Sequence, residues 1–283
     1  MNPLVSLVSP VYNAMPWLES FLDCMVQQTW RPLEVILVED GSTDASRECL
    51  LRRRGELEDA GIAVRLVLKE HAGQAAAFNA ALPLVSGEFF TWCDSDDLLT
   101  PDSIEKKVLW LLAHPDVGMV RSNGIVLDAD KDEVLSESTR ECDRHDQDIF
   151  EDLFLGRTYC YAGCYMVRSD LFFACYPQRR IPESPEGQNL QLLLPPASRT
   201  VCGYVDEKLH TYCRRSNGHS SMKRSYQENL RRIVNFTTLR LEILEYCHCD
   251  RALYAQKARE TEENDRKILL YSAVQRARKE LGT

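Results

Sequence analysis

The sequence predicts an α/β protein with a mostly parallel central sheet, helices on both faces of that sheet and a C-terminal helical extension. Two observations predict this fold. Strand and helix signals alternate from residue 4 to residue 112, an alternation that builds parallel sheets covered by helices. The second predicted strand, residues 33–38, has too few polar residues for an exposed face, as expected for a strand with helices on both sides.

The alternating part consists of short apolar runs separated by helical segments. The predicted strands are residues 4–8, 33–38, 63–68 and 88–93. The predicted helices are residues 17–28, 44–58, 73–82 and 101–112. Ser42 and Thr43 offer caps for the second helix, and Pro101 suits the first position of the fourth. In open sheets of this kind, ligands bind at the carboxyl ends of the strands, so the residues directly after each strand are the candidate site.

The second half of the chain is less regular. Strands are predicted at 117–127, 163–167 and 201–212, a helix at 169–174, a polar surface excursion at 128–150 and a loop at 177–185. A further helix starts at Gln191 and is expected to stop at Pro195 and Pro196. From residue 225 onward the pattern is helical. We therefore expect a first domain over residues 1–222 and a helical extension over 223–283, which packs on the first domain or forms a homodimer with a second copy.

Composition excludes several classes of protein. The 283 residues include 44% hydrophobic and 27% charged residues, as in ordinary globular proteins. The net charge of −9 disfavours nucleic acid as a partner, because backbone phosphates would repel an acidic chain. An anionic small ligand stays possible if a bound metal supplies positive charge.

No apolar stretch has the ~20 residues of a membrane span, and the start lacks the pattern of a signal peptide. We expect a cytoplasmic protein, in contact with the inner membrane surface at most peripherally. The 11 cysteines are an odd number without regular spacing, which favours reduced thiols. The adjacent Cys247, His248 and Cys249 are a weak zinc signal, because no second ligand pair lies nearby.

Asp94, Asp96 and Asp97 directly follow the apolar strand at 88–93. Carboxylates crowded at a strand end repel one another unless a cation offsets the repulsion. Their hard oxygens suit Mg²⁺ or Mn²⁺, with diphosphate oxygens completing the coordination. The alternative is an acidic cap at the start of the helix that begins near Pro101.

A second acidic turn, Glu39-Asp40-Gly41, closes the strand at 33–38. A carboxylate here can accept hydrogen bonds from a nucleotide base or from ribose hydroxyls, and Gly41 permits a tight turn. An Asx turn followed by a helix cap would explain the same residues without a ligand.

Four segments, taken together, resemble the ordered landmarks of family 2 glycosyltransferases of the GT-A fold. They are Ser9 to Asn13, Val38 to Asp44, the helix carrying Asn79, and Ser86-Gly87 followed by Asp94 to Asp97. Each is a weak signal alone, but all four occur in the family's order and at matching separations. The resemblance covers residues 3–222.

The resemblance implies a role for each matching residue at the donor. Pro10, Tyr12 and Asn13 line the nucleotide pocket, while Glu39, in place of the usual Asp, and Asp40 contact base and ribose. The donor is also approached by His71, Gly73 and Gln74. Asp94, beside Ser95, contacts the ribose or the sugar, Asp96 is the direct metal ligand, and Asp97 supports the sugar or the loop.

A later segment, Tyr212 to Ser220, resembles the family's Y-x-x-R-x-x-S-H-S motif. The resemblance implies that His219 is a second protein ligand of the metal and that Arg214 or Arg215 neutralises the leaving diphosphate. The alternative for His219 is a histidine on a surface loop.

The general base is where the sequence departs from the family pattern. The usual Glu-Asp pair aligns with Gln188-Asn189, and amides cannot act as a base, although they can bind sugar hydroxyls. Glu186 is the favoured replacement and Glu183 a second candidate. Another carboxylate, a donor phosphate or a loss of activity are the remaining possibilities.

The sequence therefore predicts a hexosyltransferase-type enzyme. It uses Mn²⁺ or Mg²⁺ to move a sugar from a nucleotide-diphosphate sugar, expected to be UDP-linked, to a carbohydrate or glycoconjugate acceptor. Inversion is implied by the resemblance, as is a place in polysaccharide or glycoconjugate synthesis. Two rivals remain: a nucleotide-sugar-binding protein with impaired catalysis, and a nucleotidyltransferase. The second is disfavoured because Ser9 to Asn13 contains neither Gly nor Lys.

Overall fold

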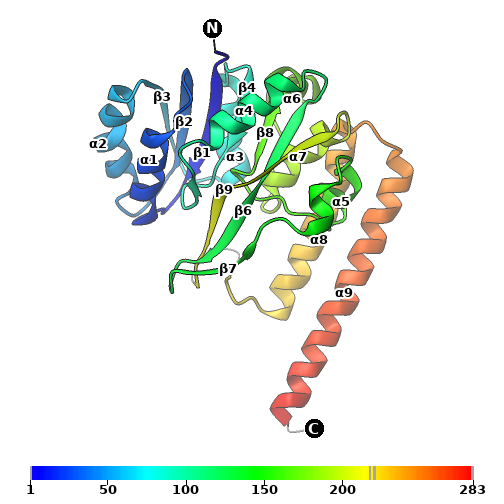
Figure 1. The fold of residues 1–283 in the computed structure, drawn as a ribbon. Helices are drawn as coiled ribbons and strands as arrows, with labels where there is room; N and C mark the ends of the chain where they lie inside the picture. Colours follow the sequence, from blue (N-terminus) through cyan, green and yellow to red (C-terminus); the bar gives the residue numbers. More distant parts are fainter. Residues whose placement is uncertain (1, 217, 219–220, 282–283) are drawn as a thin grey trace.

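The computed structural model describes residues 2–216, 218 and 221–281 and contains one mixed sheet with helices on both faces (Figure 1). The strands are β1 (Val5–Val11), β2 (Leu33–Asp40), β3 (Ile62–Lys69), β4 (Phe89–Trp92), β5 (Leu98–Leu99), β6 (Met119–Asp128), β7 (Glu133–Glu137), β8 (Tyr165–Arg168) and β9 (Cys202–Arg214). The helices are α1 (Trp17–Gln27), α2 (Ser46–Asp59), α3 (Gln74–Ala81), α4 (Ser103–Ala113), α5 (Phe150–Phe154), α6 (Ser169–Cys175), α7 (Gln188–Ala197), α8 (Tyr226–Ile243) and α9 (Arg251–Leu281).

The strand order is β3-β2-β1-β4-β8-β6-β9-β5, with β7 paired to β6. The first four strands are parallel, and every residue of β2 is buried, as the sequence predicts. Beyond β4 the sheet becomes mixed: β8 runs antiparallel to β4 and β6, while β6 and β9 are parallel. The two-residue strand β5, which has no counterpart among the predicted elements, pairs with β9.

Two hydrophobic cores lie on the two faces of the sheet. One contains the apolar sides of α1, α2 and α4, and the other those of α3, α5, α6, α7 and α8. The predicted α/β arrangement with helices on both faces is therefore confirmed.

The helix expected to stop at Pro195 and Pro196 instead includes both prolines. It begins at Gln188 and runs to Ala197. Pro195 has no N–H for the carbonyl of Gln191, four residues earlier, which a helix needs. The hydroxyl of Tyr176 donates to that carbonyl at 2.7 Å in its place. The predicted end of the helix at the prolines was wrong, because the side chain of Tyr176 donates to the carbonyl that proline leaves without a partner.

The predicted surface excursion at 128–150 is confirmed only in its first part. All five residues of β7 are exposed, but Asp143, Ile149 and Phe150 are buried. The carboxylate of Asp143 accepts a hydrogen bond from the hydroxyl of Thr158 at 2.6 Å. The end of this segment is therefore part of the folded body.

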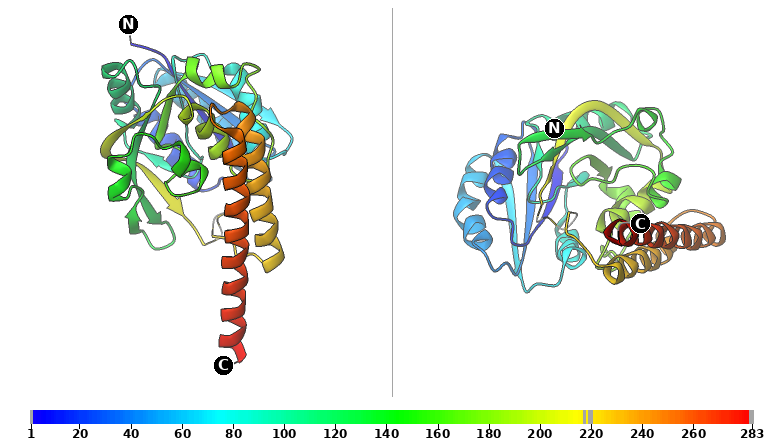
Figure 2. Two further views of the ribbon diagram at one scale, coloured as in Figure 1. Left: turned by 90° about the vertical axis from the view of Figure 1, so that its right-hand side faces the viewer. Right: turned by 90° about the horizontal axis from the view of Figure 1, so that it is seen from below.

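The C-terminal helices α8 and α9 lie side by side, and α9 extends well past the sheet (Figures 1 and 2). Leu239 and Ile243 of α8 and Ala258 of α9 enter the core shared with α7, so packing on the rest of the chain is confirmed. The domain boundary at 222 and a homodimer through these helices stay predictions. No helix in the described ranges has a stretch long and apolar enough to span a bilayer.

Candidate active site

The carboxyl ends of β1, β2 and β4 lie next to one another, because these strands are adjacent and parallel. The segments at and after these ends are 12–13, 39–44 and 94–97, of which residues 39 and 40 are the last two of β2. The sequence-predicted donor residues are thus brought to one edge of the sheet.

Asn13 holds the turn after β2 in place. Its backbone has a φ of 48°, a left-handed conformation in which Asn is favoured. Its Oδ1 accepts from the backbone N–H of Thr43 at 2.8 Å, and its own N–H donates to Ser42 Oγ at 3.1 Å. Pro10, within β1, is partly buried. Asn13 therefore joins the end of β1 to the acidic turn.

Asp40 is the centre of a hydrogen-bond cluster that shapes the loop before α3. Its buried carboxylate accepts from the N–H of Gly73 at 2.8 Å and contacts His71 Nδ1 at 2.9 Å. Lys69 Nζ also pairs with it. The ring of His71 stacks on that of Tyr12, with centroids 3.9 Å apart, and Tyr12 is 44% exposed. This stack presents an accessible aromatic face.

Gly41 is required by close packing. Its φ is +72°, and a Cβ would lie 2.5 Å from the backbone nitrogen of His71.

Glu39 points inward: it is fully buried, accepts from the N–H of Ser42 at 2.5 Å and pairs with Arg47 Nε at 3.3 Å. Its carboxylate stabilises the turn.

The acidic segment after β4 contains carboxylates in three different environments. Asp94 Oδ1 accepts from Gln74 Nε2 at 2.9 Å. Burial, with the nearby charge of Asp97, raises the pKa of Asp94 to about 7. Ser95, the next residue in the sequence, is also buried.

Asp97 supports the loop and is not available to a ligand. It accepts from the N–H of Cys213 at 2.9 Å and contacts His210 Nε2 at 3.1 Å, both on β9. Burial raises its pKa to about 7. The alternative of a helix cap is wrong, because α4 begins at Ser103 with Asp102 at its N-cap position.

Asp96 forms an ion pair with Arg215, which directly follows β9. The guanidinium of Arg215 also lies over the ring of Trp17, 4.0 Å from its centroid. Arg214, the other candidate, is exposed. The contribution of Trp17 was missed, because its apolar side chain fits the helical pattern of α1 equally well.

The carboxylates of Asp94 and Asp96 fit a hard divalent ion, whose further ligands would come from a diphosphate. Across the described ranges, no group of three or more His, Cys, Asp and Glu side chains is arranged to hold a metal. His219, the expected second ligand, lies outside the described residues. Cys247 and Cys249 are free thiols.

The acceptor-side residues lie at the start of α7. Asn189 Oδ1 accepts from Trp92 Nε1 at 2.9 Å, which ties α7 to the end of β4. Glu186 pairs with Arg232 Nε of α8 at 2.9 Å. Glu183 pairs with Arg180 at 2.6 Å and contacts Asn79 Nδ2 at 3.3 Å.

A cavity of about 350 Å³ connects the two sides of the candidate site. It is lined by Gly73 and Gln74 from the donor side and by Glu183 and Gln188 from the acceptor side. Gln74 is the residue that donates to Asp94. The sequence-predicted residues of both sides therefore border one space.

Residues 6–173, more than half of the chain, match the model of the family described as glycosyl transferase family 2. The chain belongs to this family. It is 35% identical over 117 residues to glycosyltransferase GlyA of Streptococcus pneumoniae, and 37% identical over 103 residues to chondroitin synthase of Pasteurella multocida. These matches cover 40% and 36% of this chain but only 16% and 10% of those proteins, so the chain spans a small part of its curated relatives' length.

Solved structures of glycosyltransferases share the fold of this chain. TarS of Staphylococcus aureus, residues 1–349 in complex with UDP-GlcNAc, matches with a TM-score of 0.65 at 15% identity, over 91% of this chain and 71% of that one. The mannosyltransferase PcManGT of Pyrobaculum calidifontis, in complex with GDP-Man and Mn²⁺, matches with a TM-score of 0.60 at 19% identity, over 97% and 76%. The predicted GT-A fold is therefore confirmed.

Proposed function

We propose that this chain catalyses the metal-dependent, inverting transfer of a sugar from a UDP-linked donor to an acceptor hydroxyl. The observation that carries the proposal is the position of Asp94 and Asp96 directly after β4, beside the turns that follow β1 and β2. Support for the kind of donor comes from the structural relatives, of which one was solved with UDP-GlcNAc and one with GDP-Man and Mn²⁺.

On the donor side, the stacked rings of Tyr12 and His71 offer a flat surface for the nucleotide base. Asp40 keeps His71 and Gly73 in position through the contacts described above. Asp94 and Asp96 would hold the ion, which supplies a Lewis acid for the leaving diphosphate. Arg215 brings a positive charge to the same place and favours the negative charge that develops there.

On the acceptor side, Glu186 is the proposed general base. The guanidinium of Arg232, 2.9 Å from the carboxylate of Glu186, holds this side chain in position, and a carboxylate is a group that can accept a proton. Gln188 and Asn189 present amide groups at the start of α7, which suit hydrogen bonds to acceptor hydroxyls. Glu183 is more exposed.

The test is a binding and hydrolysis screen of UDP-, GDP- and dTDP-sugars with and without Mn²⁺. Asp96→Asn should abolish Mn²⁺-dependent binding, while Asp116→Asn, at an exposed position after α4, should leave it unchanged. Glu186→Gln should keep donor binding but lose at least ~10²-fold in transfer rate, whereas Glu183→Gln stays within about threefold of the wild type.

Three results would count against parts of this proposal. Binding of no donor under any condition would refute it. Donor binding without turnover in the wild type would favour the alternative of a nucleotide-sugar-binding protein. Loss of activity in Glu183→Gln rather than Glu186→Gln would move the base to Glu183.

A further inference from the structure

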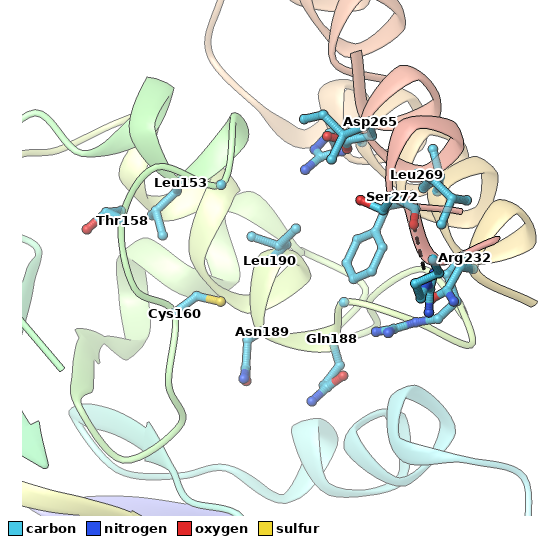
Figure 3. A pocket seen from close by; sticks show the side chains of 18 residues that line it. Leu153, Thr158, Cys160, Gln188, Asn189, Leu190, Arg232, Asp265, Leu269 and Ser272 are labelled. Atoms are coloured by element: carbon cyan, nitrogen blue, oxygen red, sulfur yellow. Dashed lines mark hydrogen bonds between the residues drawn. The ribbon is translucent and has the colours of Figure 1, made fainter. Parts of the chain in front are cut away.

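A larger cavity, of about 680 Å³, lies between the start of α7 and the C-terminal helices α8 and α9. Figure 3 shows Leu153, Thr158 and Cys160 along one wall and Asp265, Leu269 and Ser272 of α9 along the other. Gly187 marks its edge: its φ is +72°, and a Cβ there would lie 2.7 Å from the side chain of Leu239 in α8. The helical extension thus forms half of this cavity.

The lining combines apolar surface with positive charge. Leu190, Ile233 and Phe236 contribute apolar side chains. The charged lining residues are three arginines and one acid: Arg232, Arg240, Arg276 and Asp265. The cavity is therefore locally positive in a chain whose net charge is −9. Such a site selects an anion.

Arg240 and Arg276 each have guanidinium N–H groups that can donate hydrogen bonds to a ligand. Arg240 is buried and uses its Nε to donate to the carbonyl of Phe154 at 2.8 Å. Among the described residues, it takes part in no ion pair within 4.0 Å. Burial lowers the pKa of Arg240, although Asp265 opposes this effect. Arg276 is exposed and donates from Nε to the carbonyl of Ser272 at 3.3 Å.

The cavity adjoins the candidate active site on two sides. Gln188 lines both this cavity and the smaller one that reaches Gln74. Arg232 lines the cavity and pairs with Glu186. In Figure 3 the side chains of Gln188 and Asn189 project from the start of α7 away from Asp265. A molecule held here would have one end near the proposed base.

We infer that this cavity binds the acceptor, and that the acceptor carries a phosphate group next to an apolar segment. The phosphate lies among the arginines, which bind it through charge-assisted hydrogen bonds, and the apolar segment packs on Phe236 and Leu269. A phosphate monoester has a charge near −2 at neutral pH and would meet the guanidinium groups of Arg240 and Arg276, since Arg232 is paired with Glu186. The inference rests on the proposed function, because it assigns the acceptor of that reaction.

Calorimetric titration of the full chain with n-octyl phosphate tests the inference, with inorganic phosphate and octyl glucoside as the two half-ligands. Octyl phosphate should bind at least tenfold more tightly than either. Arg276→Gln should weaken its binding at least fivefold. The matched control is Lys267→Gln, on the same helix, exposed and paired with Glu263, which should stay within twofold. Equal binding of octyl phosphate and octyl glucoside, or an unchanged affinity in Arg276→Gln, overturns the inference.

Binding of UDP with Mn²⁺, measured in the same samples, separates this inference from the proposed function. UDP binding without octyl phosphate binding refutes the acceptor assignment alone. Octyl phosphate binding without UDP binding refutes the proposed function and leaves only a phosphate site. Flotation with phosphatidylcholine vesicles containing phosphatidic acid identifies the source: flotation that Arg276→Gln loses assigns a lipid-linked acceptor, and octyl phosphate binding without flotation assigns a soluble one.

Discussion

At the level of single residues, Asp96 and Arg215 form the ion pair that a divalent ion would have to replace. Both side chains are only partly exposed, and Arg215 is held over Trp17. An ion pair of this kind is worth about 1 kcal/mol. The bound guanidinium therefore competes with a metal for the same carboxylate, while its charge serves the leaving diphosphate.

We predict that Arg215→Met raises the affinity of the nucleotide-free protein for Mn²⁺ about fivefold, the equivalent of about 1 kcal/mol. Turnover with donor and acceptor should fall about 10²-fold, because a charge aimed at the leaving group is lost. Titration followed by Mn²⁺ electron paramagnetic resonance measures the first effect. Arg214→Met, at the exposed neighbouring position, is the control. Weaker Mn²⁺ binding in Arg215→Met would contradict the competition.

Much of the donor side could be predicted from the sequence at this scale. Asp94, Asp96 and Asp40 follow apolar strands, and parallel strands end at one edge. The partners of these carboxylates could not be predicted in the same way. Arg215, directly after β9, pairs with Asp96, and His210 on β9 contacts the neighbouring Asp97. Both partners come more than a hundred residues later in the chain, and no local pattern indicates these pairings. Glu39 also differs from expectation in facing the turn rather than an open pocket.

At the level of elements, α7 depends on a hydrogen bond from outside the helix. The carbonyl of Gln191 lacks the N–H that Pro195 would have provided, and the hydroxyl of Tyr176 takes its place. Local propensity predicted a helix end at the prolines, since proline is strongly disfavoured in helix interiors. The tertiary contact that overrides this preference is not visible in the local sequence. The antiparallel pairings of β5 and β8 were beyond prediction for the same reason.

We predict that Tyr176→Phe lowers the free energy of unfolding by about 1–3 kcal/mol, the cost of leaving a buried carbonyl unpaired. The ring of Tyr246 packs at a tilt against that of Tyr176, with ring centroids 4.8 Å apart, so Tyr246→Phe is a control that keeps both rings. It should change the free energy of unfolding by less than about 0.5 kcal/mol. Urea unfolding of the three proteins measures the difference. Equal losses in both variants would show that the hydrogen bond from Tyr176 to the carbonyl of Gln191 makes no specific contribution to the stability of this helix.

At the level of the whole molecule, Lys107 of α4 connects a helix on one face of the sheet to the loop before β8. It is buried, and its ammonium donates to the carbonyl of Gly163. Burial lowers its pKa to about 8, whereas a lysine in the unfolded chain has a pKa near 10.4. Between these values the unfolded chain binds more protons, so the stability of the fold rises with pH.

We predict that the free energy of unfolding of the wild type rises by about 2 kcal/mol more than that of Lys107→Met between pH 7.5 and pH 9.5. Urea unfolding at the two pH values gives both changes. Comparing the two proteins removes the titration of cysteines and tyrosines, which they share. Parallel pH profiles would show that the lysine is not desolvated in the folded state.

The pairing of the acidic segment with β9 also has a consequence for the order in which parts of the chain can fold during synthesis. Asp97 and His210 are 113 positions apart, and β5 has β9 as its neighbour in the sheet. A ribosome adding about 5–20 residues per second needs roughly 6–23 s to reach His210 after Asp97. During that interval β1 to β4 can already pair, but the acidic segment lacks its partners. A nascent chain would therefore gain its donor site only after β9 has left the ribosome, well after the parallel strands have assembled.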